Sequence, residues 1–273
     1  MTILDTRRVE LDKLVSTWLA HSAVFDMYDA AGRSCKYFPE IGWSVVKELV
    51  RQAPNDEALR KIALTREPLE TLIVKHGPAF IDRIEAEART NVVFKKCLGM
   101  IDIAANRIPA ELWNRLAGAS ERELRVRPHS EPKFLREEEP NIEFMLDYDF
   151  HPMTEAPSFS APEMAASWLT YWETFWAWED AREVLERGGD EAWFVISELI
   201  TRSPTERGLG AIGAGPLEDW LQLHGPKVIG LLEGEAARDR RWRVAVSSVW
   251  QGDMTDELWE RVVRTRGDEP ERG

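Results

Sequence analysis

Apolar side chains recur at helical spacing in both halves of the chain. Between residues 11 and 25 they stand mostly three and four positions apart, at Leu11, Leu14, Val15, Trp18, Leu19 and Phe25. Between residues 164 and 175 the same spacing holds Met164, Trp168, Tyr171, Trp172 and Phe175. This is the periodicity of amphipathic helices, and no segment alternates with period two. The pattern therefore predicts an all-α fold.

Turn and cap residues divide each half into short helices. The stretches "PNDEALRKIAL" (54–64) and "GPLEDWLQLHG" (215–225) begin with such residues, and acids follow them, as at helix N-termini. Gly77 and Gly225 lie where a helix stop is expected, and Pro78 and Pro226 would open the next helix. We expect about six or seven short helices in each half.

The two halves are copies of one another. When residues 68–88 are aligned with residues 216–236 without gaps, ten of the 21 positions are identical. The match extends outward, because "ELWNR" (111–115) reappears as "ELWER" (257–261). A repeat of roughly a hundred residues has the size of a domain and exceeds the period of solenoid repeats. The sequence thus predicts two homologous compact helical modules, copy one over residues 1–118 and copy two over residues 163–273.

Prolines and acids dominate residues 119–162, between the copies. This segment holds six prolines and the acidic run "REEEP" (136–140), which is typical of an extended linker. A group of apolar residues predicts that part of the linker packs against one module. These residues are Phe144, Met145, Leu146, Tyr148 and Phe150.

The net charge of −13 is unevenly distributed and narrows the choice of partners. Residues 163–273 carry 22 acidic and 13 basic side chains, whereas residues 12–118 carry 14 and 15. Nucleic acids require a basic face, which this chain lacks, and an acidic surface suits a basic protein partner. Two cysteines and no apolar run long enough to span a bilayer predict a cytoplasmic protein without membrane contact.

Sequence signatures of catalysis are missing. The chain has no Gly-rich phosphate loop, no HExxH and no GxSxG, and its five histidines never cluster at metal-ligand spacing. Cys97 has Ala245 at the equivalent position of copy two, which excludes a duplicated Cys-His site. We expect no cofactor and no metal.

The "GPLED" stretch has a structural explanation. Gly215 and Pro216 would end a turn and start a helix, with Glu218 in the first turn, where exposed N–H groups attract negative charge. His224 would satisfy the last carbonyls of that helix, and Glu70 and His76 are the equivalents of Glu218 and His224 in copy one. Since six residues of helix separate Glu218 from His224 by about 9 Å, the two cannot form a catalytic pair.

A carboxylate falls on the apolar face of one helix in each copy, at Glu85 and Glu233. A buried charge needs a partner. The candidates are His76/His224, the indoles of Trp113/Trp259, and Arg115/Arg261. We favour a structural hydrogen bond for these carboxylates. The alternative is an acid with a tuned pKa, in which Glu233 works with His224, and Glu85 and His76 form a degenerate set.

Tryptophan is the most distinctive residue type, with nine of the 12 in copy two. Trp172 and Trp176 replace Ser22 and Asp26 of copy one and widen the apolar arc of that helix. The next aromatic and acidic residues are Trp178, Glu179, Asp180 and Glu183. One interpretation is a partner-binding surface, since aromatic residues are enriched at interface hot spots. The other is docking of copy two against copy one or the linker.

The order of the motifs resembles a known family. A tryptophan, EL[IV], a proline, GPLED, HGP, IExEA and ELW follow one another as in an uncharacterised bacterial domain family of unknown function. The resemblance covers both copies. Copy two carries the full "AGPLED", whereas copy one has Arg66 and Glu67 in place of Ala214 and Gly215. The resemblance implies no activity, substrate or catalytic residue.

These features predict a non-enzymatic protein-binding module that offers an acidic, Trp-rich surface to a basic protein partner. An immunity-type or inhibitor role is the specific hypothesis. Two alternatives stay open. The chain could be a small-molecule-binding or hydrolytic enzyme that uses Glu233 and His224, or a scaffold that self-associates into a homo-oligomer through the face of Trp172 and Trp176.

Overall fold

The computed structural model describes residues 3–64, 66–101, 103, 107–120 and 154–266. Within these residues the chain is helical and contains no strand, so the all-α prediction is confirmed. Most of the predicted linker, including its apolar group at residues 144–150, lies outside the described residues.

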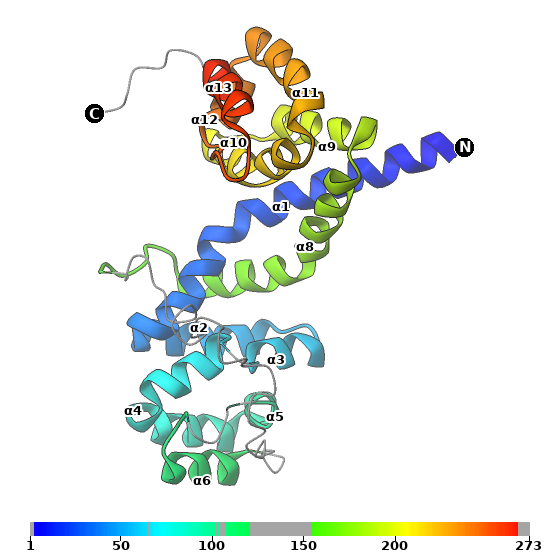
Figure 1. The fold of residues 1–273 in the computed structure, drawn as a ribbon. Coiled ribbons are helices and arrows are strands. Elements are labelled where there is room, and N and C mark those ends of the chain that lie inside the picture. Colours follow the sequence, from blue (N-terminus) through cyan, green and yellow to red (C-terminus); the bar gives the residue numbers. More distant parts are fainter. Residues whose placement is uncertain (1–2, 65, 102, 104–106, 121–153, 267–273) are drawn as a thin grey trace, which may run out of the picture. The chain divides into compact units, whose positions relative to one another are not determined.

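Among the described residues, each α-helix of copy one has a counterpart in copy two, whereas η1 of copy two has none (Figure 1). Copy one contains α1 (Ile3–Tyr37), α2 (Pro39–Gln52), α3 (Asp56–Ile62), α4 (Pro68–Thr90), α5 (Val92–Leu98) and α6 (Ala110–Ala119). Copy two contains α8 (Ala161–Arg187), α9 (Gly189–Arg202), α10 (Glu206–Ile212), η1 (Gly213–Leu217), α11 (Glu218–Arg238), α12 (Arg240–Ser247) and α13 (Asp256–Thr265). The first helix of each copy is long, with 35 residues in α1 and 27 in α8.

Equivalent helices start with equivalent caps. The side chain of Asn55 accepts a hydrogen bond from the Ala58 N–H at the start of α3, and that of Thr205 accepts one from the Gly208 N–H at the start of α10. Such caps satisfy N–H groups that have no partner within the helix. The turn signals in the sequence therefore mark these starts correctly.

The predicted helix stops at Gly77 and Gly225 are wrong. Helices α4 and α11 run through them, with Pro78 and Pro226 inside the helices. Buried residues continue on both sides of the Gly-Pro pair, with Ile73 before it and Ile81 after it in α4. Burial of this apolar face outweighs the hydrogen bond that a proline removes from a helix.

The start of the "GPLED" helix also differs from the prediction in copy two. Pro68 opens α4 in copy one, but Pro216 lies inside the π-helical turn η1, which joins α10 to α11 without a break. Gly213 permits this path, because a Cβ there would lie 2.0 Å from the carbonyl oxygen of Ala245 on α12. In copy one the chain instead turns at Arg66, whose φ of 70° lies in the left-handed region.

The chain forms two compact units, and their boundaries differ from those of the two copies. Unit 1 consists of residues 1–24 and 170–273, and unit 2 of residues 25–169. Helices α1 and α8 are each continuous, so each contributes residues to both units.

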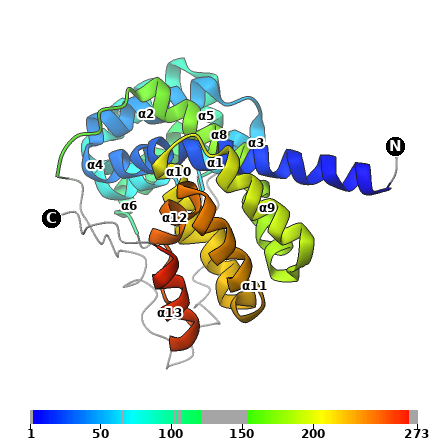
Figure 2. The same cartoon turned by 90° about the horizontal axis from the view of Figure 1, so that it is seen from above.

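Each unit has its own apolar core. In unit 1, Leu11, Leu14, Val15 and Trp18 of α1 join one buried cluster with residues of α8 to α13. There, α10, α11, α12 and α13 gather closely, as both views show (Figures 1 and 2). In unit 2, α4 contacts α2, α5 and α6. These cores fix the positions of the motif residues.

Candidate functional site

The repeated histidines cap the first helix of each copy. His224 Nε2 lies 3.0 Å from the carbonyl oxygen of Leu185 and 3.1 Å from that of Glu186, in the last turn of α8. His76 Nε2 lies 2.9 Å from the carbonyl oxygen of Lys36, near the end of α1. The sequence indicated a cap of this kind but assigned it to the histidine's own helix. The carbonyls belong instead to a neighbouring helix, because α4 and α11 continue past the histidines.

The repeated glycines let two helices touch. A Cβ on Gly77 would lie 2.6 Å from Leu112 Cδ2, and one on Gly225 would lie 2.2 Å from Leu258 Cδ2. These leucines belong to the repeated "ELW" motif on α6 and α13. The "HGP" and "ELW" motifs therefore describe one packing contact in both copies.

The repeated carboxylates bond to arginines. Arg115 Nε lies 2.8 Å from Glu85 Oε1, and Arg261 Nε lies 2.8 Å from Glu233 Oε1. Arg115 and Arg261 also reach the second oxygen of their carboxylates, at 2.8 and 2.6 Å. Hydrogen bonds to these guanidinium groups lower the pKa of both carboxyls.

The sequence analysis expected both carboxylates to be buried, but the side chains of Glu85 and Glu233 are 25% and 38% exposed. They lie at the edge of the apolar face, where the arginine can reach them from α6 or α13. Of the three candidate partners, the arginine is correct in both copies.

The glutamate of the repeated "PLE" motif binds the backbone or side chain of a distant segment. In copy two, Glu218 Oε2 accepts a hydrogen bond from the Trp250 backbone N–H at 2.8 Å, between α12 and α13. In copy one, the fully buried Glu70 accepts hydrogen bonds from the Arg66 backbone N–H and from the Arg107 side chain before α6. The predicted role of Glu218 at an open helix N-terminus is therefore replaced, since η1 precedes it.

The two residues of the catalytic alternative, His224 and Glu233, are engaged by other partners. His224 bonds to carbonyls of α8 while both oxygens of Glu233 bond to Arg261, so no hydrogen bond joins the two within the described residues. The described part of the chain also contains no group of three or more His, Cys, Asp or Glu side chains that could hold a metal ion. Both cysteines are buried, and burial raises the pKa of the Cys97 thiol to about 12.

A cleft of about 360 Å³ opens in unit 2 beside α2. Its lining residues are Ser44, Lys47, Glu48, Arg51, Glu87, Asn91, Ala161 and Pro162. The polar side chains largely bond to one another, as Arg51 does to Glu48 at 2.6 Å and Asn91 to Glu87 at 2.9 Å. The cleft was not predicted from the sequence, and its lining includes no histidine or cysteine.

The C-terminal half of α8 carries an exposed acidic surface. We define the α8 acidic surface as the exposed residues Trp178, Glu179, Asp180, Glu183 and Glu186. The Trp178 side chain is 39% exposed, and its ring stacks on Phe175 with centroids 5.8 Å apart. At 3.6 residues per turn, Glu179 and Glu186 lie about 80° to 100° from Trp178 around the helix axis, and Asp180 lies on the opposite side from Trp178.

The other two predicted tryptophans point elsewhere. Trp172 and Trp176 are half-buried, and Trp176 packs against the core of unit 1. The Lys13 ammonium of α1 lies 5.5 Å from the Trp176 ring centroid. The contact of Trp176 fits the second interpretation, in which copy two docks against copy one, whereas the rings near Trp172 are Tyr171 and Phe175 of its own helix.

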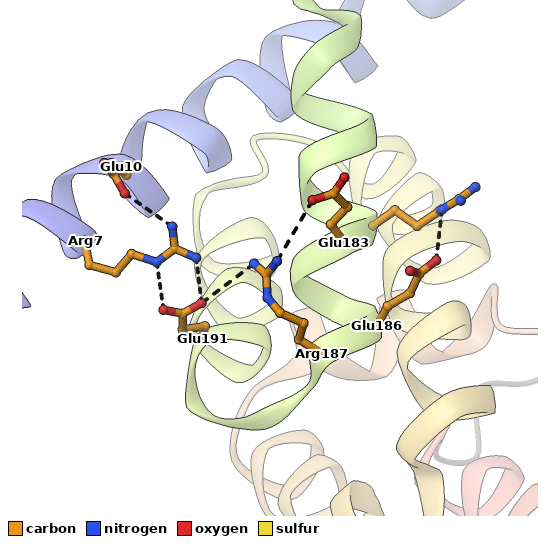
Figure 3. A network of polar contacts seen from close by, with 7 residues as sticks. Arg7, Glu10, Glu183, Glu186, Arg187 and Glu191 are labelled. Carbon is orange, nitrogen blue, oxygen red and sulfur yellow. Dashed lines mark hydrogen bonds and ion pairs between the residues drawn. The ribbon is translucent and has the colours of Figure 1, made fainter.

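Arginines neutralise only part of the α8 acidic surface. Figure 3 shows Arg187 between Glu183 and Glu191, at 4.0 Å from each, and Arg7 of α1 on the other side of Glu191. Glu186 pairs with Arg182 at 3.1 Å. By contrast, Glu179 and Asp180 form no ion pair within the described residues.

Asp219 of "GPLED" adds a further carboxyl to this region. Burial raises its pKa, and the charge of Glu186 raises it further, while Arg182 opposes the shift. The motif aspartate therefore lies within electrostatic reach of the α8 acidic surface. In copy one the equivalent residue is Thr71.

Two notable residues were missed by the sequence analysis. Trp250 is 73% exposed, and its backbone is held by Glu218. Glu67 accepts a hydrogen bond from the Trp168 indole, and its burial raises its pKa to about 7. The signal for Glu67 was present, because copy one departs from the motif there.

Among the described helices, none has the length and apolar character needed to cross a bilayer. No curated protein and no solved structure that was compared matches the chain. Residues 21–124 and residues 168–269 each match a family described as "Family of unknown function (DUF6869)". These two matches correspond to the two copies and cover most of the sequence. The chain therefore belongs to this family and contains its domain twice.

Proposed function

We propose that this protein is a non-enzymatic binding module that holds a basic protein partner on the α8 acidic surface. The observation that carries the proposal is an exposed tryptophan on the same helix turn as two exposed carboxylates that form no ion pair with any described residue. Trp178 supplies an apolar anchor, and Glu179 and Asp180 follow it directly on the same helix. Interfaces commonly place an aromatic anchor within a polar rim.

The charge of this region selects the class of partner. Residues 173–191 carry seven carboxylates and two arginines. Both arginines are engaged, Arg182 by Glu186 and Arg187 by Glu183 and Glu191. The remaining negative potential attracts a basic surface and accelerates its association. An immunity-type or inhibitor protein of the cytoplasm, which covers a basic toxin or effector, fits this chemistry.

Affinity capture from the source cells tests the proposal. The baits are the wild-type protein, a Trp178→Ala variant and a triple variant with Glu179→Lys, Asp180→Lys and Glu183→Lys. We expect the wild type to retain a basic protein in stoichiometric amount. Removal of a buried interface tryptophan costs about 2 kcal/mol or more, so Trp178→Ala should weaken binding about thirtyfold. The triple variant should lose the partner, and salt should weaken the wild-type complex.

Trp250→Ala is the matched control, since this tryptophan is more exposed than Trp178 and lies outside the α8 acidic surface. It should bind like the wild type. A partner that the triple variant retains, or the recovery of no stoichiometric partner by the wild type, would refute the proposal. Circular dichroism of each bait ensures that a loss of binding does not reflect unfolding.

A further inference from the structure

Two equivalent tryptophans each lie in a core that is built mainly from the other copy. Trp18 of copy one and Trp168 of copy two occupy the same position of the repeat. Trp18 is 4% exposed and belongs to unit 1, which is built mainly from copy two. Trp168 is 1% exposed and belongs to unit 2, which is built mainly from copy one.

The first turns of α8 are bound to copy one by several contacts. Met164 is fully buried, and its sulfur accepts a weak hydrogen bond from Ser34 Oγ at 3.9 Å. Ser167 Oγ lies 3.4 Å from the sulfur of Met27. The Trp168 indole donates to Glu67. Copy one thus provides both apolar and polar partners for this segment.

The first half of α1 is bound to copy two in the same manner. Its apolar residues are part of the unit 1 core, as described above. Arg7 holds both oxygens of Glu191, at 2.7 and 2.8 Å (Figure 3). Arg202 of α9 reaches Asp12 and Ser16, both at 2.6 Å.

We propose that the two copies exchange the first halves of their first helices, so that each copy is the binding partner that completes the other. The interaction surface of copy one accepts residues 161–169, and that of copy two accepts residues 7–24. Buried apolar contacts and polar pairs such as Arg7 with Glu191 together give each copy its partner.

The two surfaces are not interchangeable, which directs the pairing. Glu191 and Arg202, which hold α1, are replaced in copy one by Ile41 and Gln52. Glu67, which holds Trp168, is replaced in copy two by Gly215. Pairing of a copy with a second molecule of itself would lose these polar contacts, so pairing between unlike copies is favoured.

Cleavage of the folded chain tests the exchange. A recognition sequence for a site-specific protease is inserted within residues 121–153 and cut in the purified protein. We expect the two fragments to elute together from a gel-filtration column as a 1:1 complex with unchanged helicity. Fragments that separate at micromolar concentration into two folded monomers would overturn the proposal, because each copy would then be complete by itself.

A charge exchange identifies the contact. Arg7→Glu should accelerate the replacement of the N-terminal fragment by a labelled competitor about threefold to fivefold, which corresponds to an ion pair of about 1 kcal/mol. Adding Glu191→Arg should restore the slow rate. Arg83→Glu is the control, since Arg83 pairs with Glu40 inside the same fragment, at 2.7 Å. An Arg7→Glu effect no larger than that of the control, or one that Glu191→Arg leaves unrepaired, would contradict the proposed contact.

Discussion

Glu67 is the residue whose ionisation bears most directly on stability. It is half-buried beside Glu70, and it accepts the Trp168 indole N–H. Burial raises its pKa from 4.5 to about 7 in the folded state. The folded chain therefore binds this proton more tightly than the unfolded chain does. The stability due to this group is greatest below pH 4.5 and declines as the pH rises to about 7.

We therefore predict that Glu67→Gln stabilises the protein above pH 7. The amide oxygen can still accept the indole N–H, but no charge is buried. The difference in the free energy of unfolding between pH 5 and pH 8 should change by up to about 3 kcal/mol relative to the wild type. Urea unfolding at the two pH values measures it. Equal pH dependence in both proteins would show that Glu67 does not titrate in this range.

Glu233 and Arg261 should behave as a surface ion pair. We predict that Glu233→Gln lowers the free energy of unfolding by less than about 1 kcal/mol, because both side chains are partly exposed. Since the pKa of Glu233 is lowered by Arg261, this contribution is present at neutral pH and is lost as the pH falls. A double-mutant cycle with Arg261→Gln measures the coupling. A coupling of zero would mean that the bidentate contact contributes nothing to stability.

The arginine partner illustrates what the sequence could predict for a residue. The helical pattern placed Glu85 and Glu233 on an apolar face, somewhat too far inward, and limited the partners to three pairs. It could not choose among them, because the choice depends on how α6 and α13 lie across α4 and α11. Likewise, sequence spacing alone could not connect Glu218 with Trp250, since they are 32 residues apart.

At the scale of the helix, glycines decide how closely elements approach. We predict that Gly225→Ala destabilises the protein by about 1 to 3 kcal/mol, because the added Cβ would overlap Leu258. Gly230→Ala on the same helix is the control. Gly230 is exposed, and a Cβ added there would meet no neighbouring atom within 4 Å. Gly230→Ala should therefore stabilise the protein by about 1 kcal/mol through helix propensity. Thermal unfolding distinguishes the two, and equal effects would contradict the packing role of Gly225.

Gly213 should be the less tolerant glycine. A Cβ there meets the backbone oxygen of Ala245, which cannot turn away as the end of a leucine side chain can. We predict that Gly213→Ala is more destabilising than Gly225→Ala and straightens η1 into a regular α-helical turn. Measurement of both variants by the same thermal unfolding gives the order. The reverse order would show that α12 moves freely relative to η1.

Helices were easier to predict than their ends. Apolar periodicity and the identity of the repeats established the all-α fold and the duplication. The Gly-Pro pairs were misinterpreted as stops because the sequence shows local propensity but not burial on both sides of the pair. The π-helical turn was missed for a similar reason, since its cause is contact with α12.

The exchanged helix halves could not be predicted at all. Both first helices carry tryptophan at the same position, so each fits the apolar pattern of either copy. The choice depends on polar residues that differ between the copies, such as Glu191 against Ile41. Of the tryptophans predicted for a partner-binding surface, Trp178 is exposed, whereas Trp172 and Trp176 are half-buried.

At the scale of the molecule, we predict that a substitution in one copy weakens the other. Trp168→Ala removes a buried side chain from unit 2, and such changes typically cost about 3 to 5 kcal/mol. Hydrogen exchange should then accelerate in α2 and α4 of copy one more than in α11 and α13 of copy two. Trp18→Ala should give the opposite distribution. Loss of protection confined to the copy that carries each substitution would refute this assignment.

The continuity of α1 and α8 also bears on the history of the duplication. A chain with a single copy would have to find its complement on another molecule, and its assembly would depend on its abundance. Fusion of the two copies in one chain replaces that encounter by an effective concentration, which does not depend on abundance. Once the pair was permanent, each copy could evolve separately. Glu67 in copy one and the six tryptophans of copy two that have no counterpart in copy one are differences of the kind that such a fusion permits.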